Sequence, residues 1–503
     1  MYKKWLTTRL PKHDEEYKNT KKKIFKKVAD EAESLYYREK FNSKTNSIKQ
    51  LWKNLNTVCS FKNRQPKRNG IPKLKVGNVY LTKPEDISNG MNSYFSTVGE
   101  KLVKSLFKNG PITHDFRSYC NVKIKESIFV EPVTKNELNR LIKKLVDSKA
   151  PGPDNIGPAL VKLVAPIITE PILHIYNLSL FNGVVPNKLK VAKVVPIFKK
   201  GDRSTASNYR PISLLSIFEK LLEKVIYERL ISFLIKHNVL NKSQFGFRKN
   251  HSTALALLEV LDNIYSKLDK HETVVGIFLD LQKAFDTVNH EILLHKLHSY
   301  GIRGVMHSWF ASYLTNRLQF TSVDNVNSEL AMVTCGVPQG SVLGPLLFLI
   351  YMNDIVNTVP GDNVKLFADD TNLFVSGTDS CLLNQTANEY IQLLNDWLLA
   401  NRLSLNLDKT CYMIFPAKKN NNTEILLKLN GVQIQRVTSC RYLGVIIDND
   451  LTWTVHIDSI YSRLLKHVGI FYKLRNKLPK SVLKIYIFCI RALLHFIWSR
   501  NLC

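Results

Sequence analysis

Two adjacent aspartates, Asp369 and Asp370, stand between two apolar runs of the chain. Residues 364–367 lead into the pair, and the run at 371–375 leaves it with alternating apolar positions. Apolar runs of this length around a short polar stretch predict a β-hairpin with the carboxylates at its turn. Neighbouring carboxylates repel and raise each other's pKa, and a divalent cation that prefers oxygen ligands would relieve this repulsion. An ordinary surface turn, where Asp is common, is the alternative interpretation.

The chain is strongly basic for its length. Its 503 residues include 71 Lys and Arg but only 42 Asp and Glu, so the net charge is +29. Such a surplus favours a polyanionic partner, nucleic acid or anionic lipid, over a merely basic protein. Residues 1–75 hold 21 Lys and Arg and 7 Asp and Glu, which is 14 (21 minus 7) of the 29. They predict a basic N-terminal arm and linker that either follows a phosphate backbone or presents a solvated helix face.

The cysteines and the two termini bear on the cellular compartment. No two of the 8 cysteines have the spacing of a zinc site, and the chain is too long for a disulfide scaffold, so we expect them to be reduced. The first residues lack the apolar core of a signal peptide. At 481–498, charged residues interrupt helical apolar spacing, which favours a packing helix over a membrane span. We therefore expect an intracellular protein of the cytoplasm or nucleus, not secreted and without a membrane partner.

Segments of different character follow the basic arm. Residues 76–146 predict an N-terminal helical extension, with a hairpin at 76–81 and helices at 84–107 and 134–146, the last one capped by Thr134. The Pro- and Gly-rich stretch 150–154 is a strong break, and helices alternate with short strands after it. The strands are expected at 191–198, 274–281, 403–415 and 441–447. The helices are expected at 160–180, 218–237, 252–268, 290–300, 309–314, 346–355 and 388–401, followed by a basic helical tail from residue 456.

A third acid, Asp280, ends the apolar strand predicted at 274–281. A charge in such a run is costly unless it is paired, so Asp280 is predicted either to bind a metal ion or to cap the next helix. It precedes Asp369 by 89 residues (369 minus 280). Three acids at strand ends in a basic chain fit two-metal phosphoryl transfer, where the protein supplies placement and charge.

Five segments, in this order, resemble one protein family. They are NYRPISLL at 208–215, QFGFR at 244–248, LDLQKAFDTV at 279–288, GVPQGSVLGP at 336–345 and FADD at 367–370. Together they look like the reverse transcriptase domain of non-long-terminal-repeat (non-LTR) retrotransposons of the jockey-like or LINE-like kind, from about residue 147 to about residue 478. The resemblance implies an α+β right-hand polymerase, preceded by the basic, mostly helical N-terminal region. Its fingers and antiparallel palm sheet would occupy 147–447, and a helical thumb, possibly truncated, would occupy 448–503.

The resemblance also implies a metal site and a proton donor. In that family the aspartate after the first palm strand and the paired hairpin aspartates hold two Mg²⁺ ions, for which Mn²⁺ is a possible substitute. The matching ligands are Asp280, Asp369, Asp370 and the backbone carbonyl of Leu281, with Asp370 also serving as an electrostatic support. Lys409 matches a lysine that protonates the departing pyrophosphate.

Further residues match the family's substrate contacts. Phe285 stands at the position of an aromatic gate that would clash with a ribose 2′-hydroxyl, although a core phenylalanine is the alternative. Lys199 and Arg210 match cations that cover the triphosphate of the incoming dNTP. Gln339 and Gly340 match the turn that borders the nucleotide pocket. The residues that match the primer grip are Tyr442, Leu443 and Gly444.

The implied activity is RNA-directed DNA polymerisation, in which dNTPs extend a DNA primer along an RNA template. A catalytically silent, nucleic-acid-binding relic of a retrotransposon polymerase is one alternative, and an RNA polymerase with a similar palm is another. No endonuclease is recognisable before the polymerase and no RNase H after it, so the chain is expected to be a fragment or a degraded copy. Gln282 departs from the family's more usual Ser.

Overall fold

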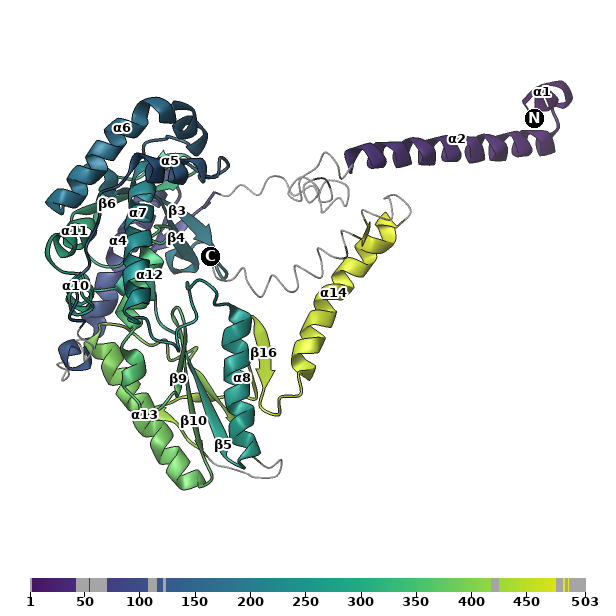
Figure 1. Cartoon of the computed structure of the whole chain (residues 1–503). Helices are drawn as coiled ribbons and strands as arrows, with labels where there is room; N and C mark the ends of the chain where they lie inside the picture. The colour runs from purple at the N-terminus through teal and green to yellow at the C-terminus, as the bar shows by residue number, and fades with distance from the viewer. Residues whose placement is uncertain are drawn as a thin grey trace. The chain divides into compact units, whose positions relative to one another are not determined.

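The computed structural model describes residues 2–41, 54, 70–106, 115–120, 124–417, 425–475, 483–484 and 487. The chain divides into two compact units, one of residues 69–440 and one that combines residues 1–68 with 441–503. Helices and strands are mixed through the larger unit (Figure 1), as the sequence predicts. The helix predicted at 481–498 lies almost entirely outside the described residues.

A five-stranded sheet, here called the first sheet, carries the strands that end in acidic residues. Its order is β14-β11-β5-β10-β9. Central β5 (Thr273–Leu279) pairs antiparallel with β10 (Asp370–Gly377) and with β11 (Cys411–Phe415). The predicted hairpin is confirmed, since β9 (Val364–Phe367) pairs with β10 across a turn at residues 368–369. The short edge strand β14 (Gln435–Arg436) runs parallel to β11.

β5 is buried along almost its whole length. A run of β-branched residues without polar alternation is what a strand covered on both faces requires. Two helices provide packing against this sheet, α8 (Thr253–Asp269) against β5 and β9, and α13 (Ser380–Ala400) against β10 (Figure 1). The first sheet is therefore a rigid base for the residues at its strand ends.

A second sheet has the order β4-β3-β6-β7, with β8 also paired to β6. β3 (Val191–Phe198) matches its predicted range and pairs antiparallel with β4 (Tyr209–Leu214) and parallel with β6 (Arg317–Val323). The short strands β7 (Val326–Asn327) and β8 (Ala331–Val333) complete the sheet. No sequence pattern predicted β6, β7 or β8.

The helix α4 (Pro84–Leu106) packs against β6, β7 and β8. The Asn92 side chain connects it to this sheet, because its Nδ2 donates to the Glu329 carbonyl at 2.8 Å and its Oδ1 accepts from Gln319 Nε2 at 3.2 Å. The predicted hairpin that precedes it consists of β1 (Leu74–Val76) and β2 (Val79–Leu81). The segment that the sequence predicts as an extension thus belongs to the same compact unit as both sheets.

The remaining helices of this unit enclose a single large core. Aromatic rings fill it, and Trp309, Trp397 and Tyr351 are fully buried. Lys296 is also buried, with its Nζ donating to the Tyr351 carbonyl and to Asp354 Oδ1, both at 2.6 Å, which compensates for its charge. These helices are α5 (Lys135–Lys143), α6 (Pro158–Asn182), α7 (Ile217–Lys236), α9 (Ala284–Thr287), α10 (His290–Ser299), α11 (Gly304–Leu314) and α12 (Gly344–Met352). The described residues of the unit also include short 3₁₀ turns and a small hairpin: η2 (Phe116–Tyr119), η3 (Asn187–Lys190), η4 (Ala206–Asn208), η5 (Ile355–Asn357), and β12 (Lys428–Leu429) with β13 (Val432–Gln433).

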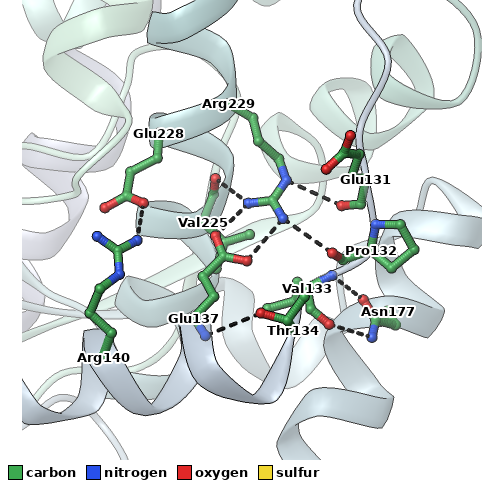
Figure 2. Close-up of polar contacts among 10 residues, drawn as sticks. All are labelled: Glu131, Pro132, Val133, Thr134, Glu137, Arg140, Asn177, Val225, Glu228 and Arg229. Carbon is green, nitrogen blue, oxygen red and sulfur yellow. Dashed lines mark hydrogen bonds and ion pairs between the residues drawn. The ribbon is translucent and has the colours of Figure 1, made fainter.

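Polar contacts join α5 to α7 (Figure 2). Thr134 caps α5 as predicted, since its side chain accepts from the Glu137 amide at 3.2 Å. The Arg229 guanidinium of α7 binds both oxygens of the Glu137 carboxylate, at 2.8 and 3.0 Å, and also donates to the Glu131 carbonyl at 3.2 Å. Asn177 of α6 holds the segment before α5, since its Oδ1 accepts from the Val133 amide and its Nδ2 donates to the Val133 carbonyl. Three helices therefore meet at one hydrogen-bonded seam.

The prediction of one continuous strand at 441–447 is wrong. The structure has a hairpin there, β15 (Ser439–Tyr442) and β16 (Val445–Asp448), turned by Leu443 and Gly444 with φ of 46° and 92°. Glycine adopts positive φ at little cost, which turns the chain instead of extending it. The strand predicted at 403–415 is shorter than expected, because only β11 is extended and Lys409 lies in the turn before it.

The described part of the smaller unit includes the helices α1 (Tyr2–Thr8), α2 (Pro11–Lys40) and α14 (Thr454–Leu474). The Asp448 carboxylate fixes the entry to α14 by accepting from the backbone amides of Thr452 and Trp453, both at 2.8 Å. This accounts for the helical tail that the sequence predicts from residue 456. In the part of the chain that the structure describes, α6 is the one helix that is long and apolar enough to cross a membrane.

Candidate active site

The pairing of β5 and β10 brings two of the three predicted acids to the same end of the first sheet. Thr371 lies opposite Leu279 in the antiparallel register. The next residues outward are Asp370 and Asp280, so these two also face each other across the pair of strands. Asp369 occupies the adjoining turn. The hairpin and the end of β5 thus assemble three acids that are far apart in the sequence.

Two of these carboxylates, Asp369 and Asp370, have raised pKa values. Removal from water is the main cause that raises the pKa of Asp369, and the charge of Asp280 adds to it. The same causes, with the Asp369 charge, raise the pKa of Asp370 to about 7. Water still reaches Asp370, whose side chain is exposed, but the surrounding protein displaces much of the bulk solvent. Carboxylates that resist ionisation in this way are suited to a cation.

The oxygen donors fit hard divalent cations, although they are not arranged as a finished site. In the described ranges of the chain, no three His, Cys, Asp or Glu side chains are grouped to hold a metal ion. One reason is that Asp280 Oδ2 already accepts from Lys409 Nζ at 2.8 Å and from Asn406 Nδ2 at 2.9 Å. Carboxylates and backbone carbonyls are the ligands that Mg²⁺ prefers. Metal binding by the three acids and by the Leu281 carbonyl therefore stays a prediction.

Asp280 does not cap the helix that follows it. Lys283 is the N-cap residue of α9, and the Asp280 carboxylate points to the segment before β11 instead. The Asn406 amide also donates to the Asp280 carbonyl at 2.7 Å. Asn406 thus donates to both the side-chain carboxylate and the backbone carbonyl of Asp280. Its only sequence signal is its place three residues before Lys409.

Four cations share the electrostatic environment of the acids. Lys199 and Arg210 both lower the pKa of Asp369, in line with their predicted place beside an anionic substrate. Burial is the main cause that lowers the pKa of Lys199, and the charges of Arg210 and Lys409 lower it further. The sequence did not single out the fourth cation, Lys283, whose pKa is lowered by burial and by the same two neighbours against the opposing effect of Asp286.

The QFGFR segment fixes the turn that carries the paired aspartates. Gln244 Oε1 accepts from the amides of Gly246 and Ala368, at 2.8 and 2.9 Å. A Cβ on Gly246 would lie 2.3 Å from the Ala368 nitrogen, so only glycine allows this approach. Ala368 has a φ of +56°, a conformation that a non-glycine residue keeps only when its surroundings enforce it. Sequence reasoning noticed this segment but gave it no role.

The predicted gate residue, Phe285, is held by other aromatic rings. It stacks on Phe348 with ring centroids 4.3 Å apart and meets Phe247 edge-on at 6.1 Å. Its ring is half-buried, so it is partly a core residue and partly accessible. Both interpretations of Phe285 made from the sequence are compatible with this placement.

The turn with Gln339 and Gly340 is joined to β4. The Gln339 carbonyl accepts from the Ser213 amide at 2.7 Å. Gly340 has a φ of +124°, and a Cβ there would lie 2.6 Å from the Ser213 carbonyl oxygen. The turn therefore stays next to the strand that carries Arg210.

The three predicted primer-grip residues lie on the β15–β16 hairpin. Tyr442 ends β15 and is buried, while Leu443 and Gly444 form the turn. They belong to the smaller of the two compact units. Their role stays a prediction.

Comparisons with known proteins find RNA-directed DNA polymerases. Residues 197–447 match the family model of reverse transcriptase, described as an RNA-dependent DNA polymerase. The chain is similar to the RNA-directed DNA polymerase from mobile element jockey of Drosophila melanogaster, at 30% identity over 76% of this chain and 41% of the relative. It is also similar to the probable RNA-directed DNA polymerase from transposon BS of the same species, at 27% identity over 94% of this chain and 53% of the relative. The chain thus spans about half the length, or less, of these relatives.

Proposed function

Because the chain belongs to the reverse transcriptase family, through a domain at 197–447 related to those of non-LTR retrotransposons, we propose that it is an RNA-directed DNA polymerase. It extends the 3′-hydroxyl of a DNA primer with dNTPs and takes an RNA strand as template. The single observation that best supports this activity is the convergence of Asp280, Asp369 and Asp370 at one end of the first sheet, with cations around them.

We assign the first sheet to the palm of a right-hand polymerase and the second sheet, with α4, to its fingers. The smaller unit, with α14, would supply the thumb. The antiparallel β5–β10–β9 arrangement supports the palm, and the acids at its strand ends support the position of the active site. Template, primer and dNTPs are the partners that this arrangement implies, and the charge of +29 suits their phosphates.

Two Mg²⁺ ions held by Asp280, Asp369, Asp370 and the Leu281 carbonyl would activate the primer hydroxyl and stabilise the pyrophosphate leaving group. Asn406 keeps the Asp280 carboxylate oriented through its side chain. Asp370, whose side chain is exposed, acts more as an electrostatic support than as a fixed ligand.

The cations divide the remaining work. Arg210 and Lys199 bind the triphosphate of the incoming dNTP, where a guanidinium forms paired hydrogen bonds with phosphate oxygens. Lys409 leaves Asp280 Oδ2 and donates its proton to the departing pyrophosphate. A polymerase of this kind depends on placement and charge, and these side chains supply both.

Phe285 supplies the choice of sugar. Its ring, held by Phe348, would meet a ribose 2′-hydroxyl and leave room for deoxyribose. Gln339 and Gly340 border the same nucleotide. Tyr442, Leu443 and Gly444 hold the primer end.

A primer-extension assay on an RNA template with Mg²⁺ tests the proposal. We expect dNTP incorporation by the full chain and a loss of about 10²- to 10³-fold in Asp369→Ala, because a charge-stabilising group at the reacting centre typically contributes that much. Phe285→Ala should admit NTPs while it retains dNTP incorporation. Asp269→Ala, which removes an exposed acid at the end of α8, is the matched control and should be unchanged. A folded full chain without any incorporation would support the silent relic instead.

A further inference from the structure

Asp286 is a partly buried acid whose carboxylate oxygen Oδ2 is shielded from solvent and which the proposed chemistry does not use. It lies on the single turn of α9, directly after Phe285. Its Oδ1 accepts from Gln339 Nε2 at 2.8 Å. Its Oδ2 is buried and has no hydrogen-bond partner among the described residues. A carboxylate in such a place is expensive, and packing alone would be served better by an uncharged side chain.

The backbone of α9 is joined to the same turn as the Asp286 carboxylate. The Val337 amide donates to the Phe285 carbonyl at 2.9 Å, and the Gly336 amide donates to the Val288 carbonyl at 2.8 Å. The side-chain bond from Gln339 is therefore the third link between α9 and this turn. The two backbone bonds fix the position of the turn relative to α9, and the third bond fixes the direction of the Gln339 side chain.

Helix α4, from outside the matched domain, packs closely against α9. Gly99 lies so close that a Cβ would be 2.1 Å from the Asp286 carbonyl oxygen and 2.7 Å from Cys335 Sγ. The Lys283 ammonium lies over the Tyr94 ring of α4, 5.8 Å from its centroid. α9 is thus in close contact with both α4 and the Gln339 turn, and it has little freedom to shift.

A small cavity remains where α4, Asp286 and the turn meet. Its volume is about 50 Å³, and its lining includes Ser96, Asp286, Cys335 and Gln339. Polar cavities of this size hold a few water molecules, since one water needs about 10–15 Å³. Water here would hydrate the carboxylate without competing for Gln339, because Oδ1 is already engaged.

We propose that Asp286 is a positioning residue of the nucleotide site, which orients the Gln339 side chain toward the incoming dNTP. This inference rests on the proposed polymerase function and on the assignment of Gln339 to the nucleotide pocket. Asp286 does not touch the substrate. It acts through one hydrogen bond, and α4 prevents α9 from moving away from the turn.

Burial is the main cause that raises the pKa of Asp286 to about 6, against the lowering effects of the Gln339 hydrogen bond and of Lys283. The carboxylate is therefore mainly ionised at neutral pH and above, and accepts a stronger hydrogen bond than a neutral group.

A double-mutant cycle on the full chain tests this role. Single-nucleotide incorporation is measured for wild type, Asp286→Ala, Gln339→Ala and the double variant. Asp286→Ala should raise the KM for dNTP about tenfold, as expected from loss of one hydrogen bond to a charged group, with a smaller change in kcat. In the Gln339→Ala background the same substitution should change KM by less than about twofold, because its target is gone.

Two further measurements separate positioning from a merely structural role. Asp286→Asn keeps an oxygen that can accept from Gln339, so it should restore KM to within about threefold of wild type. The Kd for primer–template, measured by fluorescence anisotropy, should not change in any of these variants. Asp269→Ala is again the control.

The outcomes are distinct. If Asp286→Ala raises KM equally in both backgrounds, or lowers only the melting temperature, the positioning role is overturned and the polymerase function stands. If Asp286→Asn is as defective as Asp286→Ala, the hydrogen bond to Gln339 is not what matters. If wild type neither incorporates dNTP nor binds a fluorescent dNTP on a dideoxy-terminated primer–template, the proposed function fails, and this inference fails with it.

Discussion

At the scale of single residues, charge is the main theme of the site. Asp370 is surrounded by two other acids, and its pKa is raised to about 7. The charge of Lys199 partly compensates for these acids, while Lys409 pairs with Asp280. Such a cluster lowers stability when no cation is bound and serves chemistry when one is, which is a common exchange at active sites.

Asp370→Asn should therefore stabilise the metal-free protein while it lowers activity. A carboxyl whose pKa is raised in the folded state destabilises the protein progressively as the pH rises from the unfolded-state pKa, near 3.8, to the folded-state pKa, near 7. The gain from the substitution should be absent at pH 4 and reach about 1 kcal/mol at pH 8, a modest value because the side chain is exposed. Urea unfolding in EDTA at both pH values measures it. Equal effects at pH 4 and pH 8 would contradict this account.

Sequence reasoning found the residues of this site that carry an unusual local pattern. An Asp-Asp pair between apolar runs and an Asp at the end of a buried strand are both visible in a short window. Asn406 and Gln244 were missed, because each acts on a residue more than a hundred positions away, Asp280 and Ala368. An Asn or a Gln in a loop has no local feature that reveals such a partner.

At the scale of elements, close backbone approach decides the geometry of the acidic turn. The QFGFR segment runs parallel to the end of β9, with the Phe245 amide donating to the Leu366 carbonyl at 2.9 Å. Gly246 then passes directly beside Ala368. The β9–β10 turn is thus defined by a neighbour as well as by its own sequence.

Gly246→Ala should displace this turn and reduce the incorporation rate at least tenfold. A Cβ 2.3 Å from a backbone nitrogen forces one of the two segments to move, and shifts of this size at a reacting centre are costly in rate. The single-turnover rate of dNTP incorporation measures the effect. Gly157→Ala is the matched control, because nothing lies within 4 Å of its new Cβ. A Gly246→Ala variant with the wild-type rate would show that the turn tolerates the shift.

The seam between α5 and α7 gives a second prediction at this scale. Arg229→Met should lower the free energy of unfolding by about 2 kcal/mol at pH 7, since the mostly buried Glu137 loses a paired guanidinium. Burial alone would raise the pKa of Glu137, but the hydrogen bond and charge of Arg229 outweigh it and lower the pKa. The stabilisation is therefore complete above pH 4.5, the ordinary pKa of a glutamate, and is lost as the pH falls below the lowered pKa of the folded state.

Denaturant unfolding at several pH values checks this expectation. Arg140→Met is the matched control, because its ion pair with Glu228 is largely exposed and should contribute less than about 1 kcal/mol (Figure 2). An Arg229→Met effect that does not depend on pH would show that packing of the long side chain matters more than its charge.

Helix and strand prediction succeeded where periodicity or caps are local. The ranges of β3 and α4 and the Thr134 cap are examples. β6 was missed although the first residues of its sequence, RLQFTSV, alternate between polar and apolar, because the polar Arg317, Gln319 and Thr321 are the buried ones. Its burial depends on α4 and β3, which pack on it from distant parts of the chain.

At the scale of the whole molecule, the charge is distributed unevenly. The larger unit contains the acids and their surrounding cations, while the first 75 residues hold 14 of the 29 surplus charges. Helix α2 presents Lys21, Lys22, Lys23, Lys26 and Lys27 as exposed side chains. Phe25 lies among them with 66% of its surface exposed. Lysines interleaved with an exposed aromatic ring suit single-stranded nucleic acid, where bases stack while phosphates bind the cations.

Replacing these five lysines with glutamine distinguishes an arm on nucleic acid from a solvated helix face. If they lie on phosphates, the slope of log K against log salt for primer–template binding should shrink by about 3.5 to 4.5, because each of the five phosphate contacts contributes about 0.7 to 0.9. A variant with five arginines keeps the charge and should keep the slope. Fluorescence anisotropy measured at salt concentrations from about 50 to about 200 mM gives both slopes, because counterion release changes the affinity strongly in this range. An unchanged slope in the glutamine variant would assign α2 to solvent, and the basic surface that binds template would then lie among the cations around the acids.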